Sequence, residues 1–215
     1  MGKDFKITAV KAREIIDCRG YPTVQADVWV SDTVLGQANV PCGRSTGVHE
    51  AFELRDGGKR YAGFGVWKAI TNVNKIIAPE IIGRDVRDQK GLDKLMIEMD
   101  GTQNKAKLGA NAIAGVSLAI AKAAASSLKT PLYKYIDVNA HILPVPVLDL
   151  IEGGMLAASD LDFQEHQVIP VGAKSFSEAI KMGMEVYYEL GKILAGKWGK
   201  HSLNVGVEGG YTPLG

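Results

Sequence analysis

The first part of the chain alternates apolar and polar residues with the two-residue period of β-strands. The clearest run is TVQADVWV at residues 23–30, in which every second side chain is apolar and would face one side of a sheet. Similar short runs precede and follow it, and the separators DCRGYP and SD have typical turn chemistry. The pattern predicts an antiparallel meander between Ile7 and Val40.

The apolar period changes to that of helices after residue 64. Apolar residues spaced by three and four predict helices over residues 65–82, 88–101 and 109–128. We expect Pro79 to end or bend the first of them, because proline cannot donate a helical hydrogen bond. Strands followed by helices are typical of an α+β domain, which we place at residues 1–138.

A second domain is predicted for residues 139–215. The runs HILPVPVLDLIEGG and LDFQEHQVIPVG resemble buried strands, and Ser175 with Glu178 forms a capping box that opens a long helix. The segment LNVGVEGG at residues 203–210 predicts a further strand. This order is how an α/β barrel begins, but a complete barrel takes about 250 residues, so we expect an incomplete one.

Composition and charge argue against a nucleic-acid-binding or membrane protein. The 215 residues are 46% apolar and 23% charged with a formal net charge of +1, and the basic residues form no block, so we expect no nucleic-acid partner. The most apolar stretch, residues 108–128, is interrupted by Asn111, Ser117 and Lys122, so we expect no membrane role. The start MGKDFKITAV lacks the apolar core of a signal peptide, and a cytoplasmic location is expected.

Two acidic residues are the first candidates for chemistry. Glu165 and Glu208 both lie in or at the end of predicted apolar strands. Burial would raise the pKa of either carboxyl unless a cation or hydrogen bonds compensated, and such groups suit proton transfer or metal binding. The alternative is that both acids lie at a rim and pair with lysines.

The loop PCGRSTG at residues 41–47 is the second candidate. Its glycines allow close backbone approach, and Arg44, Ser45 and Thr46 offer donors to an anion. It lacks the spacing of a phosphate-binding P-loop, so it predicts either a mobile lid that contributes a hydroxyl group or an ordinary exposed loop. The segment GGKRYAGFG is interpreted as a turn because no strand leads directly into it.

Several segments, taken in order, resemble the N-terminal half of enolase, the glycolytic phosphopyruvate hydratase. They include AREIIDCRGYPTVQADV, VPCGRSTGVHEAFELRDG, LDKLMIEMDGTQNKAKLGANAIAGVSLAIAKAAA, FQEHQVIPVGAKSFSEA and NVGVEGGYTP. The resemblance implies a meander-plus-helices domain that leads into an α/β barrel. It also implies a Mg²⁺-dependent hydro-lyase that dehydrates 2-phosphoglycerate, or a related phospho or phosphono acid, to an enol product such as phosphoenolpyruvate.

The resemblance also implies roles for particular residues. Glu208 matches the glutamate that helps to protonate the departing hydroxyl group, and Glu165 matches its acidic partner. Ser45 matches the serine that completes a second Mg²⁺ site when the loop closes over substrate. The implied substrate contacts are Gln164, Gly43, Arg44 and Thr46. The implied partners are a small phosphorylated acid and either a second copy in a homodimer or a chain that supplies the rest of the barrel.

The chain departs from the family pattern near the expected site. Met155 and Leu156 replace a serine and a histidine, Glu152 replaces an asparagine, and Val207 replaces an aspartate. Gln25 stands where a glutamate of the family's dimer contact is usual. Leucine can neither bind a phosphate nor carry a proton. These changes predict either a different substrate or a catalytically silent protein kept for binding or structure.

The family's remaining catalytic groups lie outside this sequence. The three carboxylates of the first Mg²⁺ site and the lysine base would follow Gly215. The 215 residues therefore cannot contain a complete enolase site, and one half of a split enzyme is a further alternative.

Overall fold

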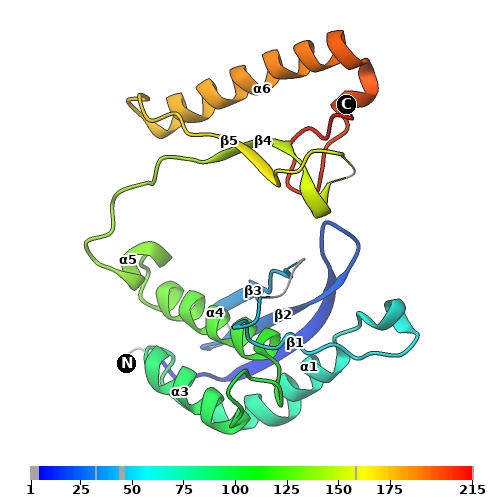
Figure 1. Ribbon diagram of the computed structural model, residues 1–215. Coiled ribbons are helices and arrows are strands. Elements are labelled where there is room, and N and C mark those ends of the chain that lie inside the picture. Colours follow the sequence, from blue (N-terminus) through cyan, green and yellow to red (C-terminus); the bar gives the residue numbers. More distant parts are fainter. Residues whose placement is uncertain (1–4, 32, 44–46, 158, 215) are drawn as a thin grey trace. The chain divides into compact units, whose positions relative to one another are not determined.

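The computed structural model describes residues 5–31, 33–43, 47–157 and 159–214. The chain divides into two compact units, Met1–Ala140 and His141–Gly215 (Figure 1). Each unit has its own sheet.

The first unit contains a three-stranded antiparallel sheet in the order β1-β2-β3. Ala26 in the central strand lies opposite Ala12 on one side and Ala38 on the other. All three are buried because every second side chain faces the helices. The predicted meander is confirmed, with strands β1 (Ala9–Ile16), β2 (Pro22–Trp29) and β3 (Leu35–Asn39).

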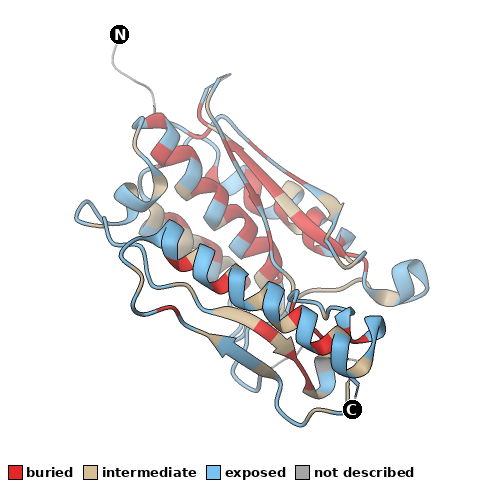
Figure 2. Cartoon of the chain, turned by 90° about the horizontal axis from the view of Figure 1, so that it is seen from above, coloured by how far each residue is buried: buried red, intermediate tan, exposed pale blue. Residues whose placement is uncertain are grey.

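Helix α4 (Ala110–Ser127) covers β2 and β3. Its alanine-rich sequence lets the two layers approach closely: a Cβ atom at Gly36 would lie only 2.1 Å from the backbone oxygen of Ala119. Buried residues, red in Figure 2, follow α4 and the strands. The helical segments of this unit are η1 (Arg60–Gly63), α1 (Trp67–Asn72), η2 (Val73–Ile77), α2 (Ala78–Ile81), α3 (Gln89–Asp100), α4 (Ala110–Ser127) and α5 (Leu132–Ile136).

Pro79 lies two residues before the end of the helical segment, near the place where the sequence predicts an end or a bend. The chain stays helical to Ile81, and the π-helical turn η2 separates α1 from α2. Pro79 falls in the first turn of α2, where the missing backbone N–H costs few helical hydrogen bonds. The wider hydrogen-bond spacing of η2 adapts the helix before the proline.

The second unit contains the antiparallel pair β4 (Leu148–Glu152) and β5 (Glu165–Val168), followed by the long helix α6 (Phe176–Trp198). The Oγ of Ser175 accepts a bond from the Glu178 N–H at 3.1 Å, which confirms the predicted cap. The Glu178 carboxylate accepts from the Lys174 N–H at 2.7 Å. Short 3₁₀ turns are η3 (Gly154–Leu156) and η4 (Lys200–Leu203). Within the described ranges, no helix has the length and apolar character needed to cross a membrane.

The further strand predicted over residues 203–210 is wrong. Val205 and Tyr211 form an isolated antiparallel bridge, and the chain turns back between them so that the Gly206 N–H donates to the Gly210 oxygen at 2.9 Å. Tyr211, beyond the turn, is the residue that bridges Ile151 in parallel. Glycine-rich backbone favours such a turn over an extended strand. Glu208 is therefore carried by a turn, not by a strand end.

Candidate active site

Acidic residues from three segments of the second unit converge. Glu152, the last residue of β4, lies directly opposite Glu165, the first residue of β5. The backbone N–H of Glu208 donates to Oε1 of Glu152 at 2.9 Å. The Glu165 side chain lies close enough to the Glu208 carboxyl to raise its pKa. The structure thus brings together the two acids singled out from the sequence.

Glu208 holds its proton more tightly than an isolated glutamate. Although Glu208 is exposed, partial loss of water around its carboxyl raises its pKa, and the negative charges of Glu165 and Glu152 raise it further. None of the ion pairs identified among the described residues involves Glu208 or Glu165, so the predicted alternative of lysine pairing is absent there. The carboxyl of Glu208 is therefore suited to donate a proton.

Asp149 is an acid that the sequence reasoning missed. Both of its carboxylate oxygens are buried and have no hydrogen-bond partner among the described residues. Burial raises its pKa to about 6, helped by the charges of Glu152, Glu165 and Glu208, whereas His166 acts in the opposite direction. An acid in the middle of the apolar run VPVLDLI was the signal that could have revealed it.

Gln164 lies next to the acids, as the resemblance implied. Its Nε2 donates to Oε1 of Glu165 at 3.3 Å, and Gln167 donates to the other oxygen. The backbone oxygen of Gln164 accepts from the Gly153 N–H at 2.8 Å, so the residue is tied to the end of β4. A substrate contact from Gln164 stays a prediction.

The described structure does not show the predicted residues of the loop at 41–47 near the acids. Arg44, Ser45 and Thr46 lie outside the described residues, as does the side chain of Leu156. Gly43 is described, but it belongs to the first unit, whereas the acids belong to the second. Their approach to a common substrate stays a prediction.

Gly43 lines a pocket of about 830 Å³ in the first unit. Two guanidinium groups also line it, but both already have acidic partners. Arg19 pairs with Asp17 at 3.0 Å, and Arg55 pairs with Glu53 at 2.7 Å. Because these charges are neutralised within the unit, the pocket by itself is a weak site for an anion.

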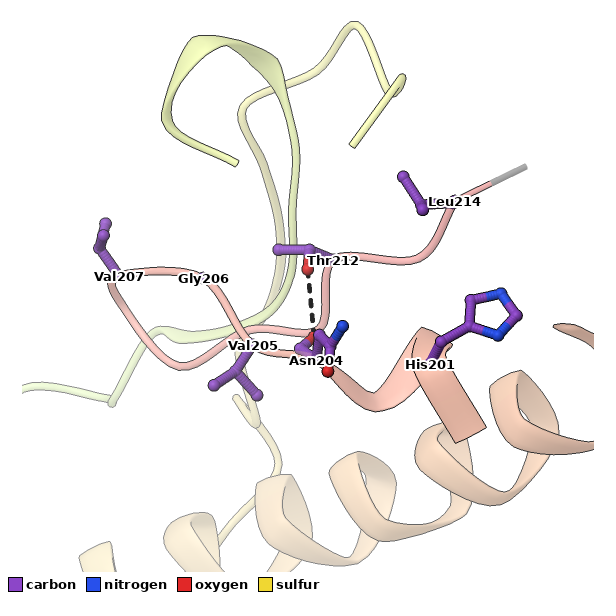
Figure 3. A pocket seen from close by; sticks show the side chains of 7 residues that line it. All are labelled: His201, Asn204, Val205, Gly206, Val207, Thr212 and Leu214. Atoms are coloured by element: carbon purple, nitrogen blue, oxygen red, sulfur yellow. Dashed lines mark hydrogen bonds between the residues drawn. The ribbon is translucent and has the colours of Figure 1, made fainter. Parts of the chain in front are cut away.

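Figure 3 shows a smaller pocket of about 460 Å³ in the second unit, beside the turn that carries Glu208. The hydroxyl of Thr212 donates to the Asn204 backbone oxygen at 3.2 Å and closes the base of the turn. The described lining has no carboxylate, so this pocket is separate from the acids. It is lined by His201, Asn204, Val205, Gly206, Val207, Thr212 and Leu214.

A complete ligand set for the predicted Mg²⁺ is not found in the described part of the chain. No group of three or more His, Cys, Asp or Glu side chains there is arranged to hold a metal ion. The Glu152 carboxylate instead accepts backbone N–H groups of the turn, and the Asp149 carboxyl has no hydrogen-bond partner among the described residues. We therefore derive no step through a metal from these residues.

Comparison with known proteins identifies the family. Residues 7–136 match the model of the enolase N-terminal domain, and residues 140–214 match that of the enolase C-terminal TIM barrel domain. The chain belongs to the enolase family. The resemblance and the fold class inferred from sequence, an α+β domain followed by the start of the enolase barrel, are thereby confirmed.

Similar proteins named enolase occur in several archaea. The chain is 58% identical to one from Thermococcus gammatolerans over 214 residues and 56% identical to one from Pyrococcus furiosus over 214 residues, covering 99% of this chain and 50% of the relative in both cases. It is 58% identical to one from Methanothrix thermoacetophila over 210 residues, or 97% of this chain and 50% of the relative. The chain thus spans about half the length of the curated relatives it matches.

Proposed function

We propose that the protein containing this chain is an enolase-type hydro-lyase that dehydrates 2-phosphoglycerate to phosphoenolpyruvate, or acts on a related phospho or phosphono acid. The observation that carries this proposal is the convergence of Glu165, Glu208 and Glu152 in a chain of the enolase family. Dehydration needs an acid that gives a proton to the departing hydroxyl group. The raised pKa of Glu208 suits it to this step.

Glu165 supports the role of Glu208 through its charge. Its negative charge helps to raise the pKa of Glu208. The amides of Gln164 and Gln167 hold the Glu165 carboxylate in place. This division of roles assigns proton donation to Glu208 and the raising of its pKa to Glu165.

Replacement of Glu208 tests the proposal. We expect Glu208→Gln, in the complete protein, to lower kcat for 2-phosphoglycerate by about 100-fold or more, because an amide cannot donate the proton in the same way. Formation of phosphoenolpyruvate measures the rate. Glu189→Gln is the matched control, since Glu189 is an exposed acid on α6 that pairs with Lys192. Unchanged turnover in Glu208→Gln would contradict the assignment.

A second candidate is a catalytically silent member of the family that binds a phosphorylated acid. The observation that favours it is the pair of replacements near the acids, Met155 and Val207, where the family pattern has polar groups. Calorimetry with 2-phosphoglycerate distinguishes the two proposals. Binding without product formation under any divalent-metal condition supports the silent protein, whereas turnover excludes it.

The cofactor and partners belong to the same proposal. We infer that Mg²⁺ binds through Ser45 and groups outside this sequence, that the substrate is a small phosphorylated acid, and that the protein acts in the cytoplasm. We also infer a homodimer, or a chain that supplies the remaining barrel, as in a split enzyme. Light scattering of the protein purified from its source tests assembly, and a monodisperse 23.0 kDa monomer would exclude both kinds of partner.

A further inference from the structure

Glu152 lies beneath the turn that carries Glu208 and is almost completely buried, with 3% of its surface exposed. A single oxygen, Oε1, accepts two backbone hydrogen bonds from that turn: one from Glu208 at 2.9 Å and one from Gly210 at 2.8 Å. Bonds from backbone N–H groups to a carboxylate are stronger than those between neutral groups. The turn is thus clamped on both sides of Gly209.

The turn approaches Glu152 very closely. A Cβ atom at Gly206 would lie 2.0 Å from Oε2 of Glu152, and one at Gly210 would lie 3.1 Å from its Cγ. Two backbone bonds between β4 and the end of the turn complete the contact, since Tyr211 donates to Leu150 and accepts from Glu152, both at 2.9 Å. The glycines of this turn are therefore required by the side chain they surround.

A structural role alone explains this arrangement poorly. Glu152 lies directly opposite Glu165, and like charges facing each other across strands destabilise a sheet. An uncharged glutamine could accept the same two backbone bonds, in a weaker form, without that repulsion. The charge of Glu152 therefore strengthens the two hydrogen bonds and also acts on the neighbouring acids.

We propose that Glu152 is a positioning residue for Glu208: its buried carboxylate fixes the turn through the two backbone bonds and places a negative charge against that turn. The inference rests on the proposed function, because it assigns Glu208 the role of proton donor. It adds a residue at which the chain departs from the family pattern, which has an asparagine there.

The groups that interact electrostatically with Glu152 come from every segment around it. They are Asp149 on β4, Glu165 on β5, Glu208 in the turn and Tyr187 on α6. His166, on β5 opposite Ile151, is a nearby group that can carry a positive charge, and it acts on Asp149 in the direction opposite to the acids. Removing the charge of Glu152 should still relieve Glu208 of a repulsion and let it ionise at lower pH.

Two variants separate the hydrogen bonds from the charge. Glu152→Ala removes the acceptor, whereas Glu152→Gln keeps an oxygen at the same place and removes only the charge. Hydrogen exchange of the peptide covering residues 204–212, in the complete protein, reports the clamp without any need for catalysis. We expect exchange there to be about tenfold faster in Glu152→Ala and close to the parent rate in Glu152→Gln.

The pH profile of kcat reports the charge. In Glu152→Gln we expect the alkaline limb to move to lower pH, because the acid form of Glu208 is lost earlier, while KM changes little. A purely structural side chain would not move this limb. Glu189→Gln, which changes an exposed acid in the same way, should alter neither measurement.

The outcomes distinguish this inference from the proposed function. Parent-like exchange in a folded Glu152→Ala protein overturns the clamp, and an unmoved alkaline limb in Glu152→Gln overturns the role of the charge. If Glu152→Ala does not fold, the limb in Glu152→Gln decides the inference by itself. If the parent protein turns over no phosphorylated acid, the proposed function fails, while the exchange comparison still decides whether Glu152 holds the turn.

Discussion

Asp149 has a carboxyl group whose burial makes stability depend on pH. Its pKa is about 6 in the folded chain, compared with the ordinary value of 3.8. The folded state therefore binds this proton more tightly than the unfolded state does. The resulting stabilisation is fully present below pH 3.8 and is lost as pH rises through about 6.

Replacement of this residue tests the argument. We expect Asp149→Asn to raise the free energy of unfolding by about 1 kcal/mol at a pH of about 8, because a buried charge is removed, and to change it little at about pH 4. Thermal unfolding of both proteins at the two pH values measures the difference. Other acids, such as Glu14 and Asp100 of the first unit, have a lowered pKa and also make stability depend on pH. Their contribution is the same in the parent protein and in Asp149→Asn, so it cancels from the difference. An equal effect at both pH values would contradict it.

Tyr187 ties α6 to the turn that carries Glu208. Its hydroxyl donates to the Gly209 backbone oxygen at 3.0 Å, and its ring stacks on Tyr211 with centroids 4.3 Å apart. Burial raises its pKa to about 12, so the hydroxyl remains a donor throughout the physiological range.

We expect Tyr187→Phe to lower the free energy of unfolding by about 1 kcal/mol, because it removes the hydrogen bond and keeps the stacked ring. Denaturant unfolding followed by circular dichroism measures this change. Tyr188→Phe is the matched control, since Tyr188 is 59% exposed. The argument is wrong if the two variants are equally stable.

At the scale of elements, α6 packs on the rest of its unit through glycines. A Cβ atom at Gly191 would lie 2.5 Å from the hydroxyl oxygen of Tyr211, whose ring is held by stacking on Tyr187. Gly196, on the same helix, has no atom within 4 Å of its Cβ position. The two positions therefore differ in packing while sharing one helix.

Alanine at these two positions should have opposite effects. We expect Gly191→Ala to cost about 1–3 kcal/mol of stability through overpacking, and Gly196→Ala to add about 0.5–1 kcal/mol through lower backbone entropy of the unfolded chain. Melting temperatures of the two variants against the parent provide the measurement. Destabilisation by both substitutions would mean that α6 is constrained by something other than this contact.

At the scale of the whole molecule, the two units differ in how they are stabilised. The main cluster of buried apolar side chains lies in the first unit and extends from Ile7 to Ala124. In the second unit the buried apolar side chains among the described residues are Leu150, Ala179, Leu194 and Tyr211. Since apolar burial supplies most of the favourable free energy of folding, the second unit should be the weaker one.

Hydrogen exchange along the chain tests this difference. We expect amides of β2 and α4 to exchange at least about 100-fold more slowly than those of β5 and α6. Mass spectrometry of peptides from both units gives the comparison directly. Equal protection of the two units would show that groups outside the described cluster stabilise the second one.

Much of the fold was predictable because its signals are local. Alternation over residues 23–30 identified the central strand, helical spacing identified α3 and α4, and Ser175 identified the start of α6. The strand predicted over residues 203–210 was wrong because the apolar residues there suggested an extended strand, whereas the glycines allow the chain to turn back. The sequence placed the end of this helix near Pro79 but did not reveal the π-helical turn before it, which depends on packing.

The site was predictable in part for the same reason. Glu165 and Glu208 stood out as acids beside apolar runs, and the order of segments along the chain identified the enolase family and, with it, the kind of chemistry. Asp149 and Glu152 did not acquire a role from sequence, because their importance depends on what surrounds them.

The sequence by itself determined most of the strands and helices, the family and two of the acids, Glu165 and Glu208, since these follow from residue type and near-neighbour spacing. Only the tertiary structure decided that Asp149 is buried without a partner and that Glu152 clamps a turn 56 residues away. The physical reason is that desolvation and backbone hydrogen bonding are properties of the packed surroundings, which bring together segments that no local pattern connects.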